Sequence, residues 1–351
     1  MGELLSAEAI DALLAWYRNH QRDLPWRHTK DPYAIWLSEI MLQQTRVEAV
    51  KPYYARFLER CPTVESLACL DEERLMKLWE GLGYYSRARN LQKAARTVSA
   101  QYGGRMPRSY EELRKLSGIG DYTAGAIASI AFGVRVPAVD GNVLRVLSRV
   151  SGSREDIALP ATKEAMRRAL LPLIPEAAGD FNQALIEIGA TVCVPNGEAK
   201  CDACPLASEC VAVREGLTDE IPVKSAKKPR KILPLTLLII RDGDRTVLRK
   251  RPPKGLLAGL YELPNTEGHL GEEAALAHVR ALGFEPLRIE RLEDAKHIFT
   301  HIEWQMIAYA IRVTPEFDGY PEGSGLLLVP NGELHSKYAI PSAFFAYTKY
   351  L

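Results

Sequence analysis

Residues 113–131 read LRKLSGIGDYTAGAIASIA, and this stretch decides the fold of the first half of the chain. Gly118 and Gly120 allow a sharp turn between two helices, because glycine lacks the Cβ atom that restricts other residues. The N–H groups that open the second helix can then bind a phosphate. An ordinary glycine-capped turn could have the same residues, but basic side chains lie nearby: Arg108, Arg114 and Lys115. The stretch predicts a helix-hairpin-helix over about residues 112–131, which would hold the DNA backbone without reading its sequence.

The flanking sequence predicts two domains of different class. Apolar residues recur at helical spacing from about residue 6 to residue 190, so we expect an all-α domain over residues 1–212. Residues 224–231, KSAKKPRK, hold five basic residues and no acidic one, which is typical of a solvated linker, here expected over residues 213–232. After it, LPLTLLII, TVLRKR and WQMIAYAIRV predict strands and EEAALAHVRALG predicts a helix. Residues 233–351 should therefore form an α+β domain.

Composition excludes several classes of protein. The 351 residues are enough for two domains, and no apolar run reaches the roughly 18 to 20 residues of a membrane span. The net charge of +1 gives no overall attraction to nucleic acid, so positive charge must be clustered where DNA binds. We expect a monomer in the cytoplasm, without a membrane partner, acting on the nucleoid DNA of a bacterium.

Two carboxylates are candidates for catalysis. Glu39 lies in IWLSEIMLQQTRVEAV between apolar neighbours, and lost hydration would raise its pKa and suit it to donate a proton. Asp140, in VPAVDGNVLRVLSRV, precedes a helix; it reads as an N-cap, and the helix N–H groups would keep it ionised. One neutral and one charged carboxyl is the division of labour used on glycosidic bonds. We expect Glu39 to protonate a purine and Asp140 to stabilise the sugar cation.

Other side chains would complete such a site. Tyr122 and Asn142 could hydrogen-bond to the two carboxylates. A base inside a duplex must be flipped out before the bond can be cut, which leaves a gap in the helix. Candidates to fill that gap are Gln43, Gln44, Tyr84 and Tyr85, although core packing is the alternative for each tyrosine.

A cysteine cluster predicts a metal site. Its members follow the spacing C-x7-C-x2-C-x5-C: Cys193, Cys201, Cys204 and Cys210. Four thiolates so close in a cytosolic chain favour metal over disulfides. Spacing alone leaves a 4Fe-4S cluster and a zinc ion open. Cys61 and Cys69 lack metal spacing and are expected to be small buried residues.

Taken together, these motifs resemble the MutY family of adenine DNA glycosylases over about residues 8–212. The motifs are SEIMLQQTRV, WEGLGYYSRARN, LSGIGDYTAGAI, PAVDGNVLRVLSR, FNQALIEIGA and the cysteine quartet. The resemblance implies a helix-hairpin-helix glycosylase with an iron-sulfur module, so that a 4Fe-4S cluster is favoured over zinc. It implies duplex DNA with adenine opposite 8-oxoguanine as the partner, and an abasic site as the product.

The resemblance also assigns residues by position. Glu39 and Asp140 match the catalytic pair, with Tyr122 and Asn142 as assistants. The adenine pocket would comprise Trp26, Arg27, Leu42, Val47 and Gln183. DNA contacts would come from Gln44, Thr45, Leu82, Tyr84, Gly118 and Gly120. Two departures stand out: the first cysteine gap holds seven residues instead of six, and Gln183 stands where some relatives carry Glu.

The C-terminal domain is similar to the MutT-like (Nudix-like) domain of that family. A working pyrophosphohydrolase of this fold needs a metal-binding helix motif, of which only Glu272 and Glu273 are present. We therefore expect lesion recognition without nucleotide hydrolysis. Phe299, Thr300 and His301 resemble the family's loop that contacts 8-oxoguanine, although an ordinary strand-turn is the alternative for so short a stretch.

Two other functions stay open. The first is a bifunctional glycosylase and strand-cutting lyase of the endonuclease III type, which needs a lysine to form a Schiff base. Tyr122 stands at the matching position here, and a phenol cannot form that imine. The second is a catalytically silent DNA-binding module, in which Glu39 or Asp140 would be merely structural.

Overall fold

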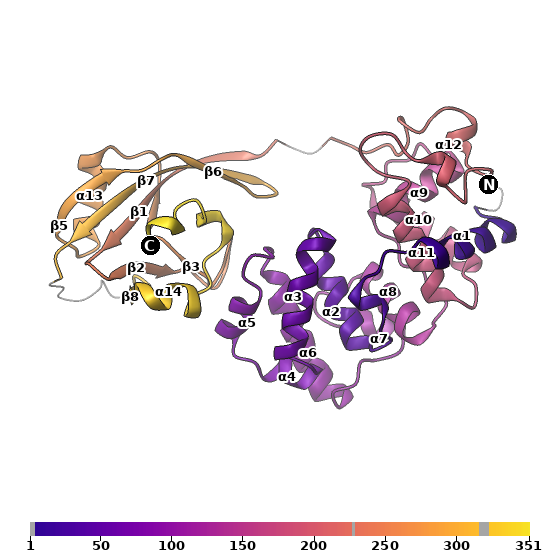
Figure 1. The fold of residues 1–351 in the computed structure, drawn as a ribbon, viewed down its shortest axis with the longest axis horizontal. Coiled ribbons are helices and arrows are strands. Elements are labelled where there is room, and N and C mark those ends of the chain that lie inside the picture. The colour runs from indigo at the N-terminus through magenta and orange to yellow at the C-terminus, as the bar shows by residue number, and fades with distance from the viewer. Residues whose placement is uncertain (1–3, 227–228, 316–322) are drawn as a thin grey trace. The chain divides into compact units, whose positions relative to one another are not determined.

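The structure, a computed structural model, describes residues 4–226, 229–315 and 323–351. Lys227 and Lys228 of the expected linker lie outside the described residues, as do the first three residues of the chain and residues 316–322 of the C-terminal domain. The chain divides into two compact units (Figure 1). One contains Met1–Leu70 and Arg89–Ala226, and the other contains Asp71–Ala88 and Lys227–Leu351.

The first unit is helical, as the sequence predicts. Its helices are α1 (Ala7–His20), α2 (Pro32–Leu42), α3 (Val47–Arg60), α4 (Val64–Cys69), most of α6 (Ser86–Tyr102), α7 (Tyr110–Arg114), α8 (Asp121–Phe132), α9 (Gly141–Ser151), α10 (Pro160–Leu170), α11 (Ala178–Thr191) and α12 (Val211–Arg214). Local signals start several of them: Ser6 caps α1, and Pro32 and Pro160 open α2 and α10.

Two central helices explain where a site can form in this unit. All residues of α2 from Tyr33 to Met41 are buried, and so are residues Thr123–Ile130 of α8. These helices pack against each other, and α8 also packs against α11. A polar side chain on α2 is therefore largely withdrawn from water, which is the physical basis of the environment of Glu39.

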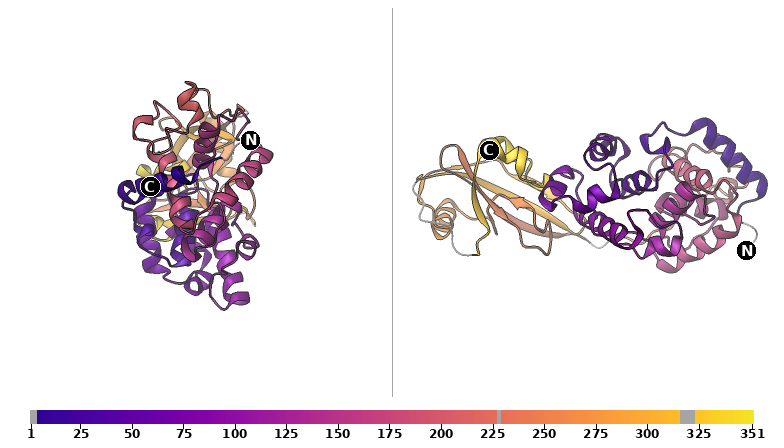
Figure 2. Two further views of the ribbon diagram at one scale, coloured as in Figure 1. Left: turned by 90° about the vertical axis from the view of Figure 1, so that its right-hand side faces the viewer. Right: turned by 90° about the horizontal axis from the view of Figure 1, so that it is seen from below.

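The second unit is built on one mixed sheet, seen from three sides in Figures 1 and 2. Its strands are β1 (Lys231–Arg241), β2 (Arg245–Lys250), β3 (Tyr261–Glu262), β4 (Asn265–Glu267), β5 (Pro286–Arg291), β6 (Ala295–Ile298), β7 (Ile302–Val313) and β8 (Leu326–Pro330). β1 and β7 pair in parallel, and the strand order is β3-β2-β1-β7-β5, with β4, β6 and β8 paired to β1, β7 and β2. Three helices complete the unit: α5 (Glu72–Leu78), α13 (Glu272–Ala281) and α14 (Asn331–Lys337).

Strand β1 separates two cores because successive side chains point to opposite faces. Leu235, Leu237 and Ile239 join a cluster that includes Phe344, whereas Leu238 and Ile240 join a cluster that contains residues of α13. The α+β prediction is confirmed, and the strands and the helix expected from periodicity are present. The strands β3, β4, β5, β6 and β8 were missed, because such short segments carry too little alternation.

The start of the expected linker is structured. Residues Val211–Arg214 form α12, the Arg149 side chain donates to the carbonyls of Thr218 and Ile221, and Ile157 N–H donates to the carbonyl of Val223 at 3.1 Å. A buried guanidinium needs acceptors, and this segment supplies them. The helical unit thus extends beyond the boundary that we expected at residue 212. Within the described residues, no helix is long and apolar enough to cross a membrane.

Candidate active site

The turn before α8 depends on glycine at one position in particular. Gly118 has φ of +78°, and a Cβ there would lie 2.8 Å from Cβ of Asn90, so other residues would be strained. Gly120 is the N-cap of α8 in extended backbone and has open space where a Cβ would point. In the first turn, the Asp121 carboxylate pairs with Arg114 at 2.5 Å, which offsets its negative charge. The N–H groups that open α8 are thus approachable, as a phosphate site requires.

Helix α8 also approaches the chain that leads to Asp140. A Cβ at Gly125 would lie 2.2 Å from the backbone oxygen of Pro137. Only glycine allows this approach without displacing the extended segment before α9. The hairpin and the second carboxylate are therefore coupled by direct packing.

Asp140 is the N-cap of α9. Its Oδ1 accepts from the N–H groups of Asn142 at 2.9 Å and Val143 at 2.8 Å, and its Oδ2 accepts from Nδ2 of Asn142 at 2.8 Å. Arg145 orients that amide by donating to Oδ1 of Asn142 at 2.8 Å. Burial raises the pKa of Asp140, and the three hydrogen bonds and Arg145 oppose that rise. The cap that we expected is present, but removal of water raises the pKa of Asp140 more than these interactions lower it.

Glu39 is buried on α2 and has the environment of a proton donor. Burial raises its pKa to about 7, the nearby Asp140 adds to the rise, and a hydrogen bond with Tyr122 and the charge of Arg27 oppose it. The phenol of Tyr122 is itself buried, and its pKa is raised well above 10 by burial. The hydroxyl of Tyr122 is therefore the donor to the Glu39 carboxylate. A carboxyl that is half protonated near neutral pH is suited to general acid catalysis.

One cavity of about 570 Å³ in the first unit brings these groups together. The predicted residues that line it are Trp26, Arg27, Glu39, Leu42, Gln43, Gln44, Thr45, Val47, Tyr122, Asp140, Asn142 and Gln183. Sequence reasoning missed further lining residues, among them Arg22, Arg46 and Ile186. The volume falls within the usual range for a small-molecule pocket, about 300–1,000 Å³, so the cavity is large enough for a purine.

Other predicted residues do not line this cavity. Gly118 and Gly120 belong to the hairpin turn, and Leu82, Tyr84 and the 299–301 segment belong to the second unit. Within that unit, the hydroxyls of Tyr84 and Thr300 are 3.0 Å apart. Tyr84 has φ of +48°, a strained conformation for a tyrosine, and such strain is frequent at functional sites.

The segment 299–301 forms a tight turn between β6 and β7. Phe299 N–H donates to the carbonyl of Ile302 at 2.8 Å, and the Phe299 ring packs edge-on against Trp304 with centroids 4.8 Å apart. Thr300 and His301 are exposed. Phe299 thus has a packing role, and the two exposed side chains are the ones available to a ligand.

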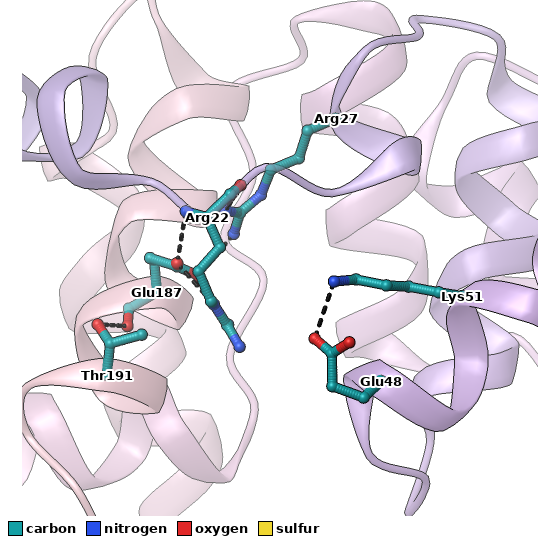
Figure 3. Close-up of polar contacts among 6 residues, drawn as sticks. All are labelled: Arg22, Arg27, Glu48, Lys51, Glu187 and Thr191. Carbon is teal, nitrogen blue, oxygen red and sulfur yellow. Dashed lines mark hydrogen bonds and ion pairs between the residues drawn. The ribbon is translucent and has the colours of Figure 1, made fainter.

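A buried ion pair stands beside the cavity, and sequence reasoning missed its carboxylate. Figure 3 shows Arg22 and Arg27 converging on Glu187 of α11. Arg27 donates to Glu187 at 2.7 Å, and Arg22 donates at 2.8 Å from both Nε and Nη2. The signal was available, because Glu187 is one charged residue in the apolar run ALIEIGA, as Glu39 is in its own helix.

The four clustered cysteines line a second, small cavity of about 20 Å³. Arg149 donates to Sγ of Cys193 at 3.2 Å, and burial raises the pKa of the Cys204 thiol to about 11. Among the described residues, no group of three or more side chains has metal-holding geometry. The thiols nonetheless share one enclosed space, which fits a soft metal or cluster better than separate structural roles. Of the other two cysteines, Cys61 is buried as expected, whereas Cys69 is exposed.

Comparisons with known proteins agree with this geometry. Residues 37–176 match the model of the HhH-GPD superfamily of base excision DNA repair proteins, and residues 235–349 match the NUDIX domain. The adenine DNA glycosylase of Mus musculus is 36% identical over 85% of this chain and 69% of its own length. That of Buchnera aphidicola subsp. Baizongia pistaciae is 36% identical over 83% of this chain and 82% of its own.

Solved structures resemble the helical half. A thermostable thymine-DNA glycosylase is similar with a TM-score of 0.53 and 31% identity, covering 59% of this chain and 95% of that one. An endonuclease III in a non-covalent complex with DNA is similar with a TM-score of 0.51 and 26% identity, covering 59% and 94%. Both likenesses cover the part of the chain that holds the cavity.

Proposed function

The chain belongs to the adenine DNA glycosylases, base excision repair enzymes with an HhH-GPD domain, and we propose that it removes adenine paired with 8-oxoguanine through Glu39 and Asp140. The membership itself makes it an N-glycosylase that acts on adenine in DNA. The observation that carries the residue assignment is the cavity: a carboxyl with a pKa of about 7 and a capped carboxylate share one pocket large enough for a purine.

The proposed reaction uses Glu39 first as an acid and then as a base. The Glu39 carboxyl gives its proton to the adenine ring, at N7, and the bond from C1′ to N9 breaks with its electron pair on the base. The Asp140 carboxylate stabilises the oxocarbenium ion that forms on the sugar. Water then bonds to C1′ and loses a proton to the Glu39 carboxylate, which restores the acid. The products are free adenine and an abasic site.

Tyr122 and Asn142 are proposed to hold the two carboxyl groups. Tyr122 donates to Glu39, and Asn142 donates to Asp140 through both its backbone and its side chain. Trp26, Leu42 and Val47 would supply apolar contacts to the base, and Arg27 and Gln183 would supply hydrogen bonds. Gly118 and Gly120 would expose N–H groups to a phosphate, while Gln44, Thr45, Leu82 and Tyr84 would contact the opened duplex.

The deciding experiment is single-turnover adenine release from a duplex with one 8-oxoguanine:adenine pair. Glu39→Gln should slow release by about 10²–10⁴-fold, because it removes the acid and keeps the shape. Glu59→Gln, an exposed change on α3, is the matched control and should release adenine at the parental rate. A Glu39→Gln protein that is as fast as the parent would rule out the assignment.

The same chemistry would leave the DNA strand uncut. Among the described residues, the cavity lining contains no lysine, and Tyr122 stands where a lyase carries one. Borohydride added during the reaction should therefore trap no covalent protein–DNA adduct. An efficient adduct would favour the bifunctional alternative.

We propose that Cys193, Cys201, Cys204 and Cys210 hold a 4Fe-4S cluster. Support comes from the shared cavity and from membership in an endonuclease III-like family that typically carries one. When bound, the cluster would link the four cysteines and so hold the loop that carries them. Purified protein should be brown and contain about four iron atoms per chain. Colourless protein that contains one zinc ion per chain would overturn the 4Fe-4S assignment and leave the proposed glycosylase activity unaffected.

The second unit is proposed to recognise 8-oxoguanine through Thr300 and His301. Both are exposed in the turn between β6 and β7, and Thr300 hydrogen-bonds with Tyr84, a proposed DNA contact. Phe299 would support the turn through Trp304. Because the phosphate contacts of the hairpin carry no base information, recognition of the lesion must come from groups such as these.

A further inference from the structure

Glu187 is fully buried, and four hydrogen bonds use the whole carboxylate. Oε1 accepts from the backbone N–H of Arg22 at 3.0 Å and from its Nε at 2.8 Å. Oε2 accepts from Nη2 of Arg22 at 2.8 Å and from Nη2 of Arg27 at 2.7 Å. Burial would raise the pKa of Glu187, but these bonds lower it to about 2. The carboxylate is therefore ionised throughout the working range of pH.

Arg27 depends on this carboxylate. Its side chain is only 9% exposed. It also donates to the carbonyl of Arg22 at 2.9 Å, and its guanidinium lies over the ring of Tyr17. Neither of these carries a negative charge. A guanidinium withdrawn from water needs a charged partner, and Glu187 supplies it.

Arg27 in turn faces the proton donor. It lines the same cavity as Glu39, and its positive charge favours the ionised form of that carboxyl. In a cavity with little water, the potential at Glu39 depends on how well Arg27 is compensated. The chain thus places three ionisable groups in sequence: the anion Glu187, the cation Arg27 and the proton donor Glu39.

We propose that Glu187 is a positioning residue for adenine excision, which holds Arg27 against the base pocket and compensates its charge so that Glu39 keeps its proton. This inference rests on the proposed function, since it takes Glu39 as the acid. Glu187 does not line the cavity, so it acts through Arg27 and not on the base.

Charged and titratable groups from several helices surround Glu39 and Glu187. Those that act on Glu39 are Tyr122 from α8, Asp140 from the cap of α9 and Arg27. Those near the Glu187 pair are Arg22, Tyr17 of α1, Asp180 of α11 and Glu48 of α3. Glu48 is exposed and pairs with Lys51 on its own helix, as Figure 3 shows, so it cannot replace Glu187.

The test is the pH profile of single-turnover adenine release by the full-length protein at saturating enzyme. In Glu187→Gln, uncompensated Arg27 should lower the pH at which release begins to fall by about one unit, and slow release at pH 8 by about tenfold. Release at low pH should stay within a few-fold of the parent. Glu187→Asp should restore most of the parental profile, and Glu48→Gln, the matched control, should not change it.

A double variant keeps the test decisive. Glu187→Gln with Arg27→Gln removes both charges, so the profile should return to or above the parental midpoint, whereas a purely structural role predicts no such reversal. If Glu187→Gln unfolds, the double variant alone is compared with Arg27→Gln. Because Glu187 acts through Arg27, the two midpoints should be equal, and a midpoint that Glu187→Gln still shifts in the absence of Arg27 overturns the proposal. A folded Glu187→Gln protein with the parental profile overturns it as well.

The two proposals fail separately. If Glu39→Gln abolishes release and Glu187→Gln has the parental profile, only the present inference is wrong. If Glu39→Gln releases adenine normally, the acid is another group and the proposed function is wrong.

Discussion

At the scale of single residues, the protonation of Glu39 makes a prediction about rate. Its pKa is raised to about 7, chiefly by burial, and the reaction needs the protonated form. Single-turnover release should be nearly constant below pH 7 and fall about tenfold for each unit above it. A rate that stays level to pH 9 in the parental protein would contradict the role of Glu39 as acid.

The same residue makes a prediction about stability. A carboxyl whose pKa rises on folding stabilises the folded state at low pH, and this contribution is lost as the pH rises toward 7 and beyond. Glu39→Gln removes the buried charge, so it should raise the free energy of unfolding by roughly 2 kcal/mol at pH 8. At pH 5 the parent and the variant should unfold at nearly the same urea concentration. If the parent and Glu39→Gln were equally stable at both pH 5 and pH 8, the pKa of Glu39 would not be raised by burial.

Functional side chains could be predicted where the adjacent residues in the sequence indicate whether the side chain is buried. Apolar residues on both sides of Glu39 predicted the raised pKa, which the structure has. For Asp140 the helix start was correct, but the local sequence did not reveal the burial that raises its pKa, because that burial comes from other helices. Glu187 was missed although it is a charged residue in an apolar run. Its partners Arg22 and Arg27 could not be read from the local sequence, because they lie 165 and 160 residues away.

At the scale of helices and strands, the approach of α8 to the chain before Asp140 can be tested at Gly125. A methyl group there would collide with the Pro137 carbonyl. Gly125→Ala should lower the free energy of unfolding by about 1–3 kcal/mol and slow adenine release, because the segment must shift. Urea denaturation measures the first effect. Gly120→Ala is the control for space: its Cβ meets open space, so any loss should be limited to the roughly 0.5–1 kcal/mol of a weaker helix cap.

Element types followed from the sequence more surely than their ends or partners. Periodicity identified β1, β2, α13 and β7, because long amphipathic or apolar segments give a clear pattern. It could not pair β1 with β7 in parallel across about 70 residues, since such pairing depends on the packing of both faces.

At the scale of the whole molecule, lesion choice and base removal are assigned to different units. His301→Ala should lower the preference for 8-oxoguanine over guanine opposite adenine by about three- to tenfold, the loss expected for one hydrogen bond. The maximal rate on the preferred substrate should change little. Competition between the two duplexes measures this. Lys296→Ala, an exposed change on β6, is the control, and an unchanged preference in His301→Ala would remove the assignment.

The double role of Asp140 has a practical consequence. Asparagine is as good a helix cap as aspartate, so Asp140→Asn should keep α9 and the two hydrogen bonds from backbone N–H groups. It should lose the bond from Nδ2 of Asn142 and the charge that the proposed sugar cation requires. Such a protein would bind its mispair and stall there. Attached to a bead or a dye, it would become an affinity reagent with which damaged sites could be counted and located in genomic DNA.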